Sequence, residues 1–303
     1  MSARSGGLPA RAVLAWALLL GLLACGPSAP ADEVTGSGSS IQNKGSDTMV
    51  NLALAWAQAY GQIRPDVQIA VTGGGSGTGI AALINGTVDM ANASRQIKPE
   101  ERQEALDNGI DPVEHVAAGD AIAIVVHPSN PVDGLTIPQL SEIYAGKITN
   151  WQEVGGEDRP IVLLSRESNS GTHVFFLENV VRRGEAGNHR LFSPDTLLMP
   201  SSEGISAEVR QNPNAIGYDG LGYVTSDQKV VAVAVEAGAP YVLPTVETAR
   251  DGSYPIARLL YIYTAGQPTG EIAEYLAWIQ GEQGQAIVRE LGFVPLQAEE
   301  AGG

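Results

Sequence analysis

The spacing of apolar residues along the chain predicts an alternation of strands and helices. In the stretch 49–60, apolar residues such as Trp56 and Tyr60 recur every three or four positions, which is typical of a helix that buries one face. β-branched runs such as 67–71 indicate strands. We expect extended segments at 41–45, 67–71, 88–91, 121–127, 161–164, 230–235 and 254–263, and helices at 49–60, 80–85, 99–108, 135–144, 173–181, 272–279 and 284–291. This alternation predicts an α/β fold with ligand sites at the carboxyl ends of strands.

Three predicted helices follow an extended segment through a stretch rich in glycine and hydroxyl side chains, at 46–48, 73–79 and 165–172. In the last stretch, Ser170, Gly171 and Thr172 fall on the first helical turn, where free N–H groups and the helix dipole favour an anion. Arg166 lies four residues earlier, and its planar guanidinium can bind two oxygens of one oxyanion. One such stretch is equally consistent with a simple helix cap, but three together indicate an oxyanion site.

The run Gly73 to Gly79 does not have the pattern of a nucleotide site. It lacks the Gly-Lys-Ser/Thr ending of a P-loop and the Gly-x-Gly-x-x-Gly spacing of dinucleotide-binding folds. Glycines let backbone N–H groups close around a small ligand, and Ser76 and Thr78 add hydroxyls to this run. The run is therefore a candidate part of the same oxyanion site.

The N-terminus has the pattern of a secretory signal, because Arg4 and Arg11 precede an apolar run at 12–23 that is too short to span a membrane. Cys25 is the only cysteine, so it cannot form an internal disulfide. The motif Leu22-Leu23-Ala24-Cys25 resembles the lipobox of bacterial lipoproteins, in which the cysteine becomes the lipidated N-terminus after cleavage. We expect lipidation at Cys25; the alternative is an incidental cysteine near a conventional cleavage site.

Composition narrows the classes of partner. A chain of 303 residues with 44% hydrophobic residues suits about two globular domains. Without the signal segment, 16 basic residues remain against 34 acidic ones, a formal charge of −18, which argues against nucleic acid as a partner. One tight anion site is still compatible with this charge, because local N–H groups can bind the anion. The four histidines have no metal-site spacing, so we expect neither metal nor cofactor.

Several of these motifs together resemble the phosphate-binding proteins of bacterial high-affinity phosphate ABC transporters, over about 41–295. They are Gly45 to Thr48, Gly73 to Gly79, Gly86 to Arg95, Lys147 to Trp151, and Arg166 with Ser170 to Thr172. The resemblance implies a two-lobed, type II periplasmic binding protein fold, each lobe a β-sheet flanked by helices. It also implies that phosphate is held in the cleft and passed to a membrane permease driven by an ATPase.

The residues themselves predict a signal peptide at 1–24, a lipid-anchored flexible tether at 25–40 and a frayed tail at 296–303. The resemblance implies two lobes between them, which we assign to 41–129 plus 253–295 and to 130–252. We expect an exported, membrane-anchored monomer facing the periplasm or the cell exterior. The two lobes should close when the ligand binds, because the proposed ligands come from distant stretches.

The resemblance also implies which residues bind phosphate: Arg166, Ser170, Gly171 and Thr172 from one lobe, and Ser76, Gly77 and Thr78 from the other, with Ser46, Asp47, Thr48, Ser94 and Arg95 completing the predicted site. Members of the family use a threonine after the first glycine turn, and an aspartate that accepts the proton of hydrogen phosphate. Asp47 stands near the former position and Arg95 at the latter.

A carboxylate acceptor would discriminate against sulfate, which has no proton to donate at neutral pH. We take Asp47 as the candidate acceptor, with a helix N-cap as the alternative role. We expect no enzymatic activity. The alternatives are a phosphoester hydrolase, since Ser170 and His173 are close in sequence although no Gly-x-Ser-x-Gly elbow is present, and an adhesin or signalling lipoprotein on the same fold.

Overall fold

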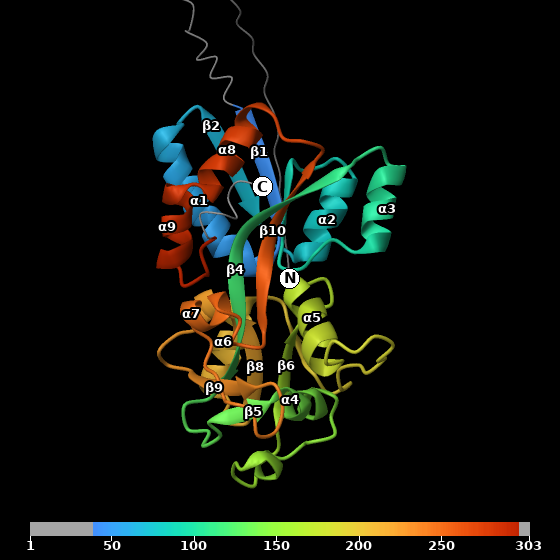
Figure 1. Ribbon diagram of the computed structural model, residues 1–303, viewed down its shortest axis with the longest axis vertical. Coiled ribbons are helices and arrows are strands. Elements are labelled where there is room, and N and C mark those ends of the chain that lie inside the picture. Colours follow the sequence, from blue (N-terminus) through green and yellow to red (C-terminus); the bar gives the residue numbers. More distant parts are fainter. Residues whose placement is uncertain (1–38, 297–303) are drawn as a thin grey trace, which may run out of the picture. The chain divides into compact units, whose positions relative to one another are not determined.

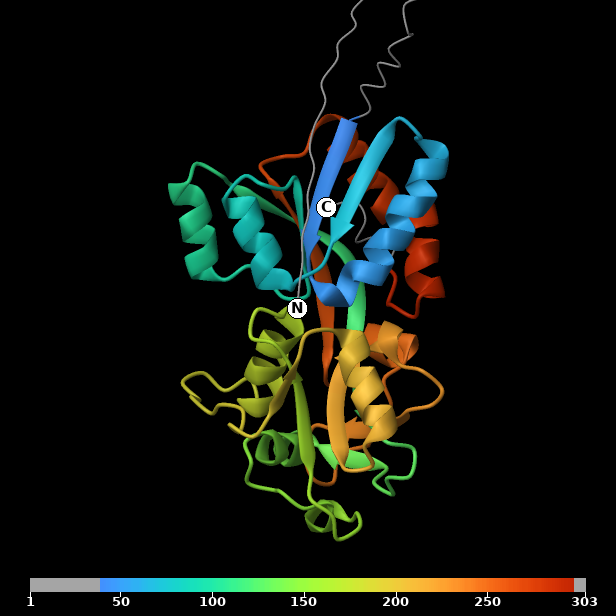
Figure 2. The same cartoon turned by 180° about the vertical axis from the view of Figure 1, so that it is seen from behind.

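The computed structural model describes residues 39–296. The predicted signal peptide, Cys25, most of the predicted tether and residues 297–303 of the predicted tail lie outside this range. The α/β alternation predicted from the apolar spacing is confirmed, and Figures 1 and 2 show the elements in two groups joined by long strands. Within 39–296, no helix is both long enough and apolar enough to cross a membrane.

The first group, called the first lobe, is built on a sheet with helices on both faces. Its elements are β1 (Ser39–Gly45), α1 (Val50–Ile63), β2 (Val67–Thr72), α2 (Ser76–Ile84), β3 (Met90–Ala93), α3 (Pro99–Asp107), α8 (Gly270–Gln280) and α9 (Glu282–Glu290). Strand β1 pairs in parallel with β2 and β3. The indole of Trp56 in α1 donates a 2.9 Å hydrogen bond to the carbonyl of Gly284 in α9, which ties the start of the lobe to its end.

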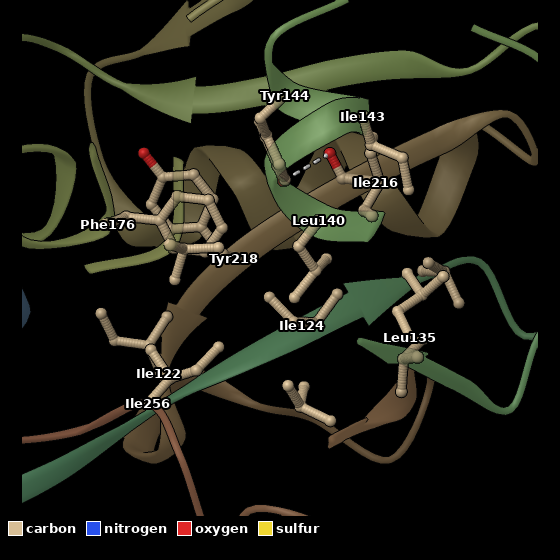
Figure 3. Close-up of a cluster of buried hydrophobic side chains, with 14 of the residues drawn as sticks. Ile122, Ile124, Leu135, Leu140, Ile143, Tyr144, Phe176, Ile216, Tyr218 and Ile256 are labelled. Carbon is tan, nitrogen blue, oxygen red and sulfur yellow. Dashed lines mark hydrogen bonds between the residues drawn. The ribbon is translucent and has the colours of Figure 1, made fainter. Parts of the chain in front are cut away.

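The second group, called the second lobe, has a mixed sheet of short strands. It contains β5 (Gly134–Thr136), α4 (Ile137–Tyr144), β6 (Val162–Arg166), α5 (Gly171–Phe176), β7 (Leu197–Met199), α6 (Ser202–Gln211), β8 (Ala215–Gly220), β9 (Lys229–Ala234) and α7 (Val246–Arg250). In its core the rings of Phe176 and Tyr218 stack 3.7 Å apart, with Tyr144 against both (Figure 3). This stack holds α5 on the sheet.

Two long strands, β4 (Pro112–Val126) and β10 (Ala257–Ala265), connect the lobes. Residues 112–121 of β4 pair with β10, residues 122–126 pair with β8, and residues 124–126 also pair with β9. Residues 121–126 already belong to the apolar clusters of the second lobe. The bounds predicted for the lobes, at 129/130 and 252/253, stay predictions.

Several elements differ from the expected ones. Strand β4 begins at Pro112 and not at 121. Its first residues are only partly buried and carry no continuous apolar run, so the sequence did not predict them as strand. Helix α2 begins at Ser76 and not at 80, directly after Gly75 at φ +94°. The predicted helix 173–181 is α5 followed by a π-helical turn at Leu177–Val181. Strands β5 and β7 and helix α7 are too short to give a periodic signal.

The packing of β8 against α6 predicts the effect of one methyl group. A Cβ added at Gly217 would lie 2.6 Å from Cγ2 of Ile205 and 3.2 Å from Cγ2 of Val209, so Gly217→Ala should lower the free energy of unfolding by about 1–3 kcal/mol. Gly61, inside α1, has no atom within 4 Å of an added Cβ, and Gly61→Ala should raise that free energy by about 0.5–1 kcal/mol. Urea denaturation followed by circular dichroism measures both. Equal stability of the two variants would contradict this account.

Candidate functional site

Four buried hydroxyl side chains from four separate stretches meet between the lobes: Thr48, Ser76, Ser94 and Thr172. We call them the hydroxyl cluster. Oγ1 of Thr48 lies 2.7 Å from Oγ1 of Thr172, across the two lobes. Oγ of Ser76 lies 3.3 Å from Oγ of Ser94 and accepts a 3.0 Å hydrogen bond from the Ser94 amide. The predicted site residues at these four positions therefore converge.

Strand register explains this convergence. Strands β1 and β3 run parallel, with Gly45 opposite Asn92, so the segments that follow them emerge side by side at the carboxyl edge of the sheet. Gly45 is required at its position, because its φ is +146° and an added Cβ would lie 2.1 Å from the Asn92 carbonyl oxygen. Only a residue without a side chain fits at position 45, from which the chain turns toward Thr48.

Gly171 brings the first turn of α5 into the hydroxyl cluster. An added Cβ there would lie 2.3 Å from Oγ of Ser76 and 2.6 Å from Oγ of Ser94. Thr172 follows it in the same turn, while Ser170 is the N-cap, whose Oγ accepts from the His173 amide. The backbone N–H groups at the start of α5 thus lie beside hydroxyls of the first lobe, and the predicted binding of an anion there stays a prediction.

A buried ion pair between Arg258 and Asp120 adjoins the hydroxyl cluster, and sequence reasoning missed both residues. Arg258 donates through Nε and Nη2 to Oδ2 of Asp120 at 3.0 and 2.7 Å. Its Nη2 also donates to Oγ1 of Thr172 at 3.0 Å, and its Nη1 to the carbonyl of Ser94 at 3.1 Å. Each of the two stands in or directly beside a predicted apolar strand, where it is the one charged residue. Because a charge at such a position is buried only when it is paired, this pattern could have indicated an ion pair.

Arg166, predicted to grip the anion, has its guanidinium at the junction between β7 and α6. Its Nε donates to the carbonyl of Met199, its Nη1 to Oγ of Ser202 and its Nη2 to the carbonyl of Pro200, at 3.0–3.3 Å. Its Nη2 also lies 3.1 Å from Oδ2 of Asp47 in the first lobe. These contacts tie Arg166 to the second lobe and bridge it to the first, and its predicted contact with the anion stays a prediction.

Asp47 is directed toward the second lobe. Besides its ion pair with Arg166, its Oδ2 accepts a 3.0 Å hydrogen bond from the Ser202 amide. Asp47 is the first residue of the 3-10 helix Asp47–Met49, whose N-cap is Ser46, so the alternative role as an N-cap is wrong. Its role as proton acceptor stays a prediction.

Asp120 is a second carboxylate beside the hydroxyl cluster. Both Asp120 oxygens lie within 3.2 Å of a Cβ built at Gly220, and Cγ2 of Thr48 lies 3.1 Å from the same point, so Asp120 and Thr48 are close neighbours.

Arg95 binds Glu101 at the start of α3 through both terminal nitrogens, at 2.8 and 2.6 Å. Burial disfavours ionisation of Glu101, but the hydrogen bonds from Arg95 and from the Lys98 amide outweigh it and hold the pKa of Glu101 below its ordinary value. Arg95 therefore stabilises the cap of α3. Its Nη2 is also 3.8 Å from a Cβ built at Gly77, beside the glycine run.

The remaining predicted residues of the first lobe face Asn169 of the second. The Gly77 amide donates to the Asn169 carbonyl at 3.0 Å, and Oγ1 of Thr78 accepts from Nδ2 of Asn169 at 3.3 Å. Oγ of Ser46 is buried and has no hydrogen-bond partner within residues 39–296. Ser46 is thus an available donor at the end of β1.

The arrangement around His173 does not make a nucleophile and base of Ser170. Nδ1 of His173 lies 3.0 Å from Oγ of Ser165, which also contacts the hydroxyl of Tyr218. Burial lowers the pKa of His173, which favours its neutral form. No group of three side chains suited to a metal ion occurs in the part of the chain that the structure describes.

Comparison with known proteins decides the family. Residues 29–283 match the PBP superfamily domain. The phosphate-binding protein PstS of Pseudomonas aeruginosa is 33% identical over 286 residues, covering 89% of this chain and 87% of that protein. The chain belongs to the PstS-type phosphate-binding family of the PBP superfamily. The PstS of Bacillus subtilis is 32% identical over 261 residues, covering 85% of this chain and 81% of that protein.

Solved structures of this family share the fold. A phosphate ABC transporter substrate-binding protein from Clostridium perfringens, with bound phosphate, has a TM-score of 0.75 and 33% identity, and covers 86% of this chain and 100% of its own. An ABC-type phosphate transport receptor from Vibrio cholerae has a TM-score of 0.68 and 29% identity, covering 84% and 100%. The predicted resemblance and the two-lobed α/β fold are confirmed. These relatives are named for phosphate binding and transport, not for catalysis.

The buried carboxyl of Asp219, at the end of β8, predicts a pH-dependent stability. Burial raises its pKa from 3.8 to about 7, against the opposing positive charge of Arg166. The folded state keeps the proton of Asp219 to higher pH than the unfolded state. The contribution of this group to the free energy of unfolding is therefore complete below about pH 4 and is lost as the pH rises through about 7.

Asp219→Asn removes this titration. Its free energy of unfolding, relative to the natural chain, should therefore rise by on the order of 2–3 kcal/mol between pH 5 and pH 7.5. Urea titrations of both proteins at the two pH values measure the difference. Parallel pH profiles would show that Asp219 does not hold its proton in the folded state.

Proposed function

We propose that this chain captures inorganic phosphate outside the cytoplasm and delivers it to an ABC permease with its ATPase subunits. The observation that carries the proposal is the hydroxyl cluster, which joins donors from both lobes at the first turn of α5 and beside Arg258. The names of the relatives support the same function.

The donor set suits a small tetrahedral anion. Hydroxyls and backbone N–H groups can each donate one hydrogen bond to a phosphate oxygen, and a buried setting strengthens such bonds because water does not compete. The predicted site residues Ser46, Ser170 and Gly171 lie at the same helix starts as the hydroxyl cluster. We propose that phosphate separates the direct contact between Thr48 and Thr172 and replaces it with two bonds to its own oxygens.

The anion can approach from one side of the lobe interface. A hollow of about 460 Å³ there is lined by residues of both lobes, including the cationic side chains Arg95, Lys98 and Arg258. Arg95 and Arg258 are paired with Glu101 and Asp120, and Glu178 also lines the hollow, so the hollow offers an anion N–H donors at little net charge. Arg258 both lines this hollow and contacts Thr172, so it connects the approach to the hydroxyl cluster.

Selection of phosphate over sulfate would require a carboxylate that accepts a proton. We propose that Asp120 or Asp47 fills this role, since the first lies beside the hydroxyl cluster and the second bridges to Arg166. The fold need not catalyse anything to perform this capture, and we propose no catalytic role for Ser170 or His173.

Removing one hydroxyl from the site should weaken phosphate binding. Thr172→Val keeps the shape of the side chain but removes a hydrogen bond to a charged ligand, which is worth about 1.5–3 kcal/mol, so the dissociation constant should rise by roughly 10- to 150-fold. Calorimetry of the ligand-stripped mature domain against phosphate, sulfate and arsenate measures this effect.

Thr87→Val is the matched control, because Thr87 is exposed and its Oγ1 bonds only the Ala82 carbonyl within its own lobe. Its affinity should equal that of the natural chain. Absence of oxyanion binding by the natural chain would refute phosphate capture and favour an adhesin or signalling role. Hydrolysis of a phosphomonoester above background would instead revive the hydrolase alternative.

We further propose that the chain is exported, lipidated at Cys25 and held at the membrane as a monomer. Intact-mass analysis of protein from the native membrane fraction should show cleavage before Cys25 and the added mass of several acyl chains, because one chain gives only reversible membrane binding. Cys25→Ser should release the protein from that fraction. An unmodified Cys25 in the membrane fraction would contradict the lipid anchor.

A further inference from the structure

Asn169, directly before the N-cap of α5, bridges the two lobes. Its Nδ2 donates to the carbonyl of Gly74 at 2.8 Å and to Oγ1 of Thr78 at 3.3 Å. Its own carbonyl accepts a 3.0 Å hydrogen bond from the Gly77 amide. One residue of the second lobe thus makes three hydrogen bonds to the stretch Gly74 to Thr78 of the first, which leads into α2.

The glycines of that stretch allow this close approach. A Cβ added at Gly75, where φ is +94°, would lie 2.7 Å from the Asn169 carbonyl oxygen, and one at Gly77 would lie 3.3 Å from it. The glycine run was expected to surround a ligand, and here it also forms the surface on which the second lobe docks. Only a segment without side chains at positions 75 and 77 can admit the Asn169 backbone.

The bridge lies next to the hydroxyl cluster along both chains. Ser76 stands between Gly75 and Gly77, and Thr172 follows Asn169 by three positions. The lobes cannot separate at the hydroxyl cluster unless the bonds of Asn169 also break. Because the Asn169 side chain is exposed, water can replace its two bonds, so they form and break readily.

We propose that Asn169 is a latch that sets how long the lobes stay closed on the anion, without choosing which anion binds. The proposal rests on the proposed phosphate capture. It assigns Asn169 a positioning role: its neutral side chain holds the glycine run against α5 but contributes no charge to the site. The ion pair of Asp47 with Arg166 also bridges the lobes, but it carries charge and involves a different segment of each.

The latch predicts faster dissociation of the bound anion. Asn169→Ala should release phosphate roughly fivefold faster in stopped-flow measurements, because two solvent-exposed hydrogen bonds at the low end of their usual worth are lost. Its association rate should not fall, because the lobes open at least as often, and its ratio of phosphate to arsenate affinity should stay unchanged. Asn169→Asp should have a larger effect, because a carboxylate cannot donate to the Gly74 carbonyl and is repelled by it.

Asn85→Ala is the matched control, because Asn85 is also exposed but donates only to Ala81 within its own lobe. Its rates should equal those of the natural chain. An unchanged dissociation rate in Asn169→Ala would overturn the latch, as would a slower association rate or an altered ratio of phosphate to arsenate affinity.

Hydrogen exchange of the Gly77 amide tests the latch without phosphate. That amide bonds to the Asn169 backbone, so Asn169→Ala leaves its acceptor in place, and its exchange should rise roughly fivefold only if the lobes open more often. If the natural chain bound no phosphate, the proposed function would fail, whereas the latch would still be judged by this exchange. Unchanged exchange of the Gly77 amide would overturn it.

Discussion

The buried pair of Arg258 and Asp120 is the interaction on which the arrangement of the lobes depends. The two residues stand opposite each other where β10 pairs with β4, at the point where β4 leaves the first lobe. A buried ion pair stabilises a fold only when its other hydrogen-bonding capacity is satisfied. Arg258 meets that condition by donating to the Ser94 carbonyl and to Thr172, while Oδ1 of Asp120 accepts from the Leu221 amide. The pair therefore fixes both connecting strands, the end of β3 and the start of α5 relative to one another.

The apolar spacing predicted the elements that bury a broad face and missed those that do not. Helix α1 and strand β10 were predicted because their buried residues recur regularly. Residues 112–120 of β4 are held by pairing with β10, and their own sequence shows little regular spacing of apolar residues. Strand β7 has two exposed leucines and three residues, too few for any period. Elements whose formation depends on a neighbouring strand cannot be recognised from their own residues.

The hydroxyls of the site were predictable and the partners of its charges were not. Thr48, Ser76 and Thr172 follow strands at helix starts, a local pattern that already implies convergence at one sheet edge. The partners of Asp47, Arg95 and Arg166 depend on which loops meet in space. Asp47 contacts Ser202, which is 155 positions away, and no sequence pattern near either residue predicts that contact. Arg95 contacts Glu101, which is only six positions away. Glu101 is the third residue of a predicted helix, a pattern that predicts a role in capping the start of that helix.

Pairing of the charges also explains how an acidic chain can hold an anion. Arg258 is neutralised by Asp120, Arg95 by Glu101 and Arg166 by Asp47, so the surroundings of the hydroxyl cluster carry little net charge. An anion there would be stabilised mainly by oriented donors: hydroxyls, the first-turn amides of α5, and the remaining N–H groups of arginines whose positions are already fixed. Such donors need no reorganisation when the anion arrives, and they discriminate by geometry more than by charge. A site built in this way favours a ligand of one shape and size, because an anion that cannot satisfy the same set of donors leaves some of them buried and unpaired.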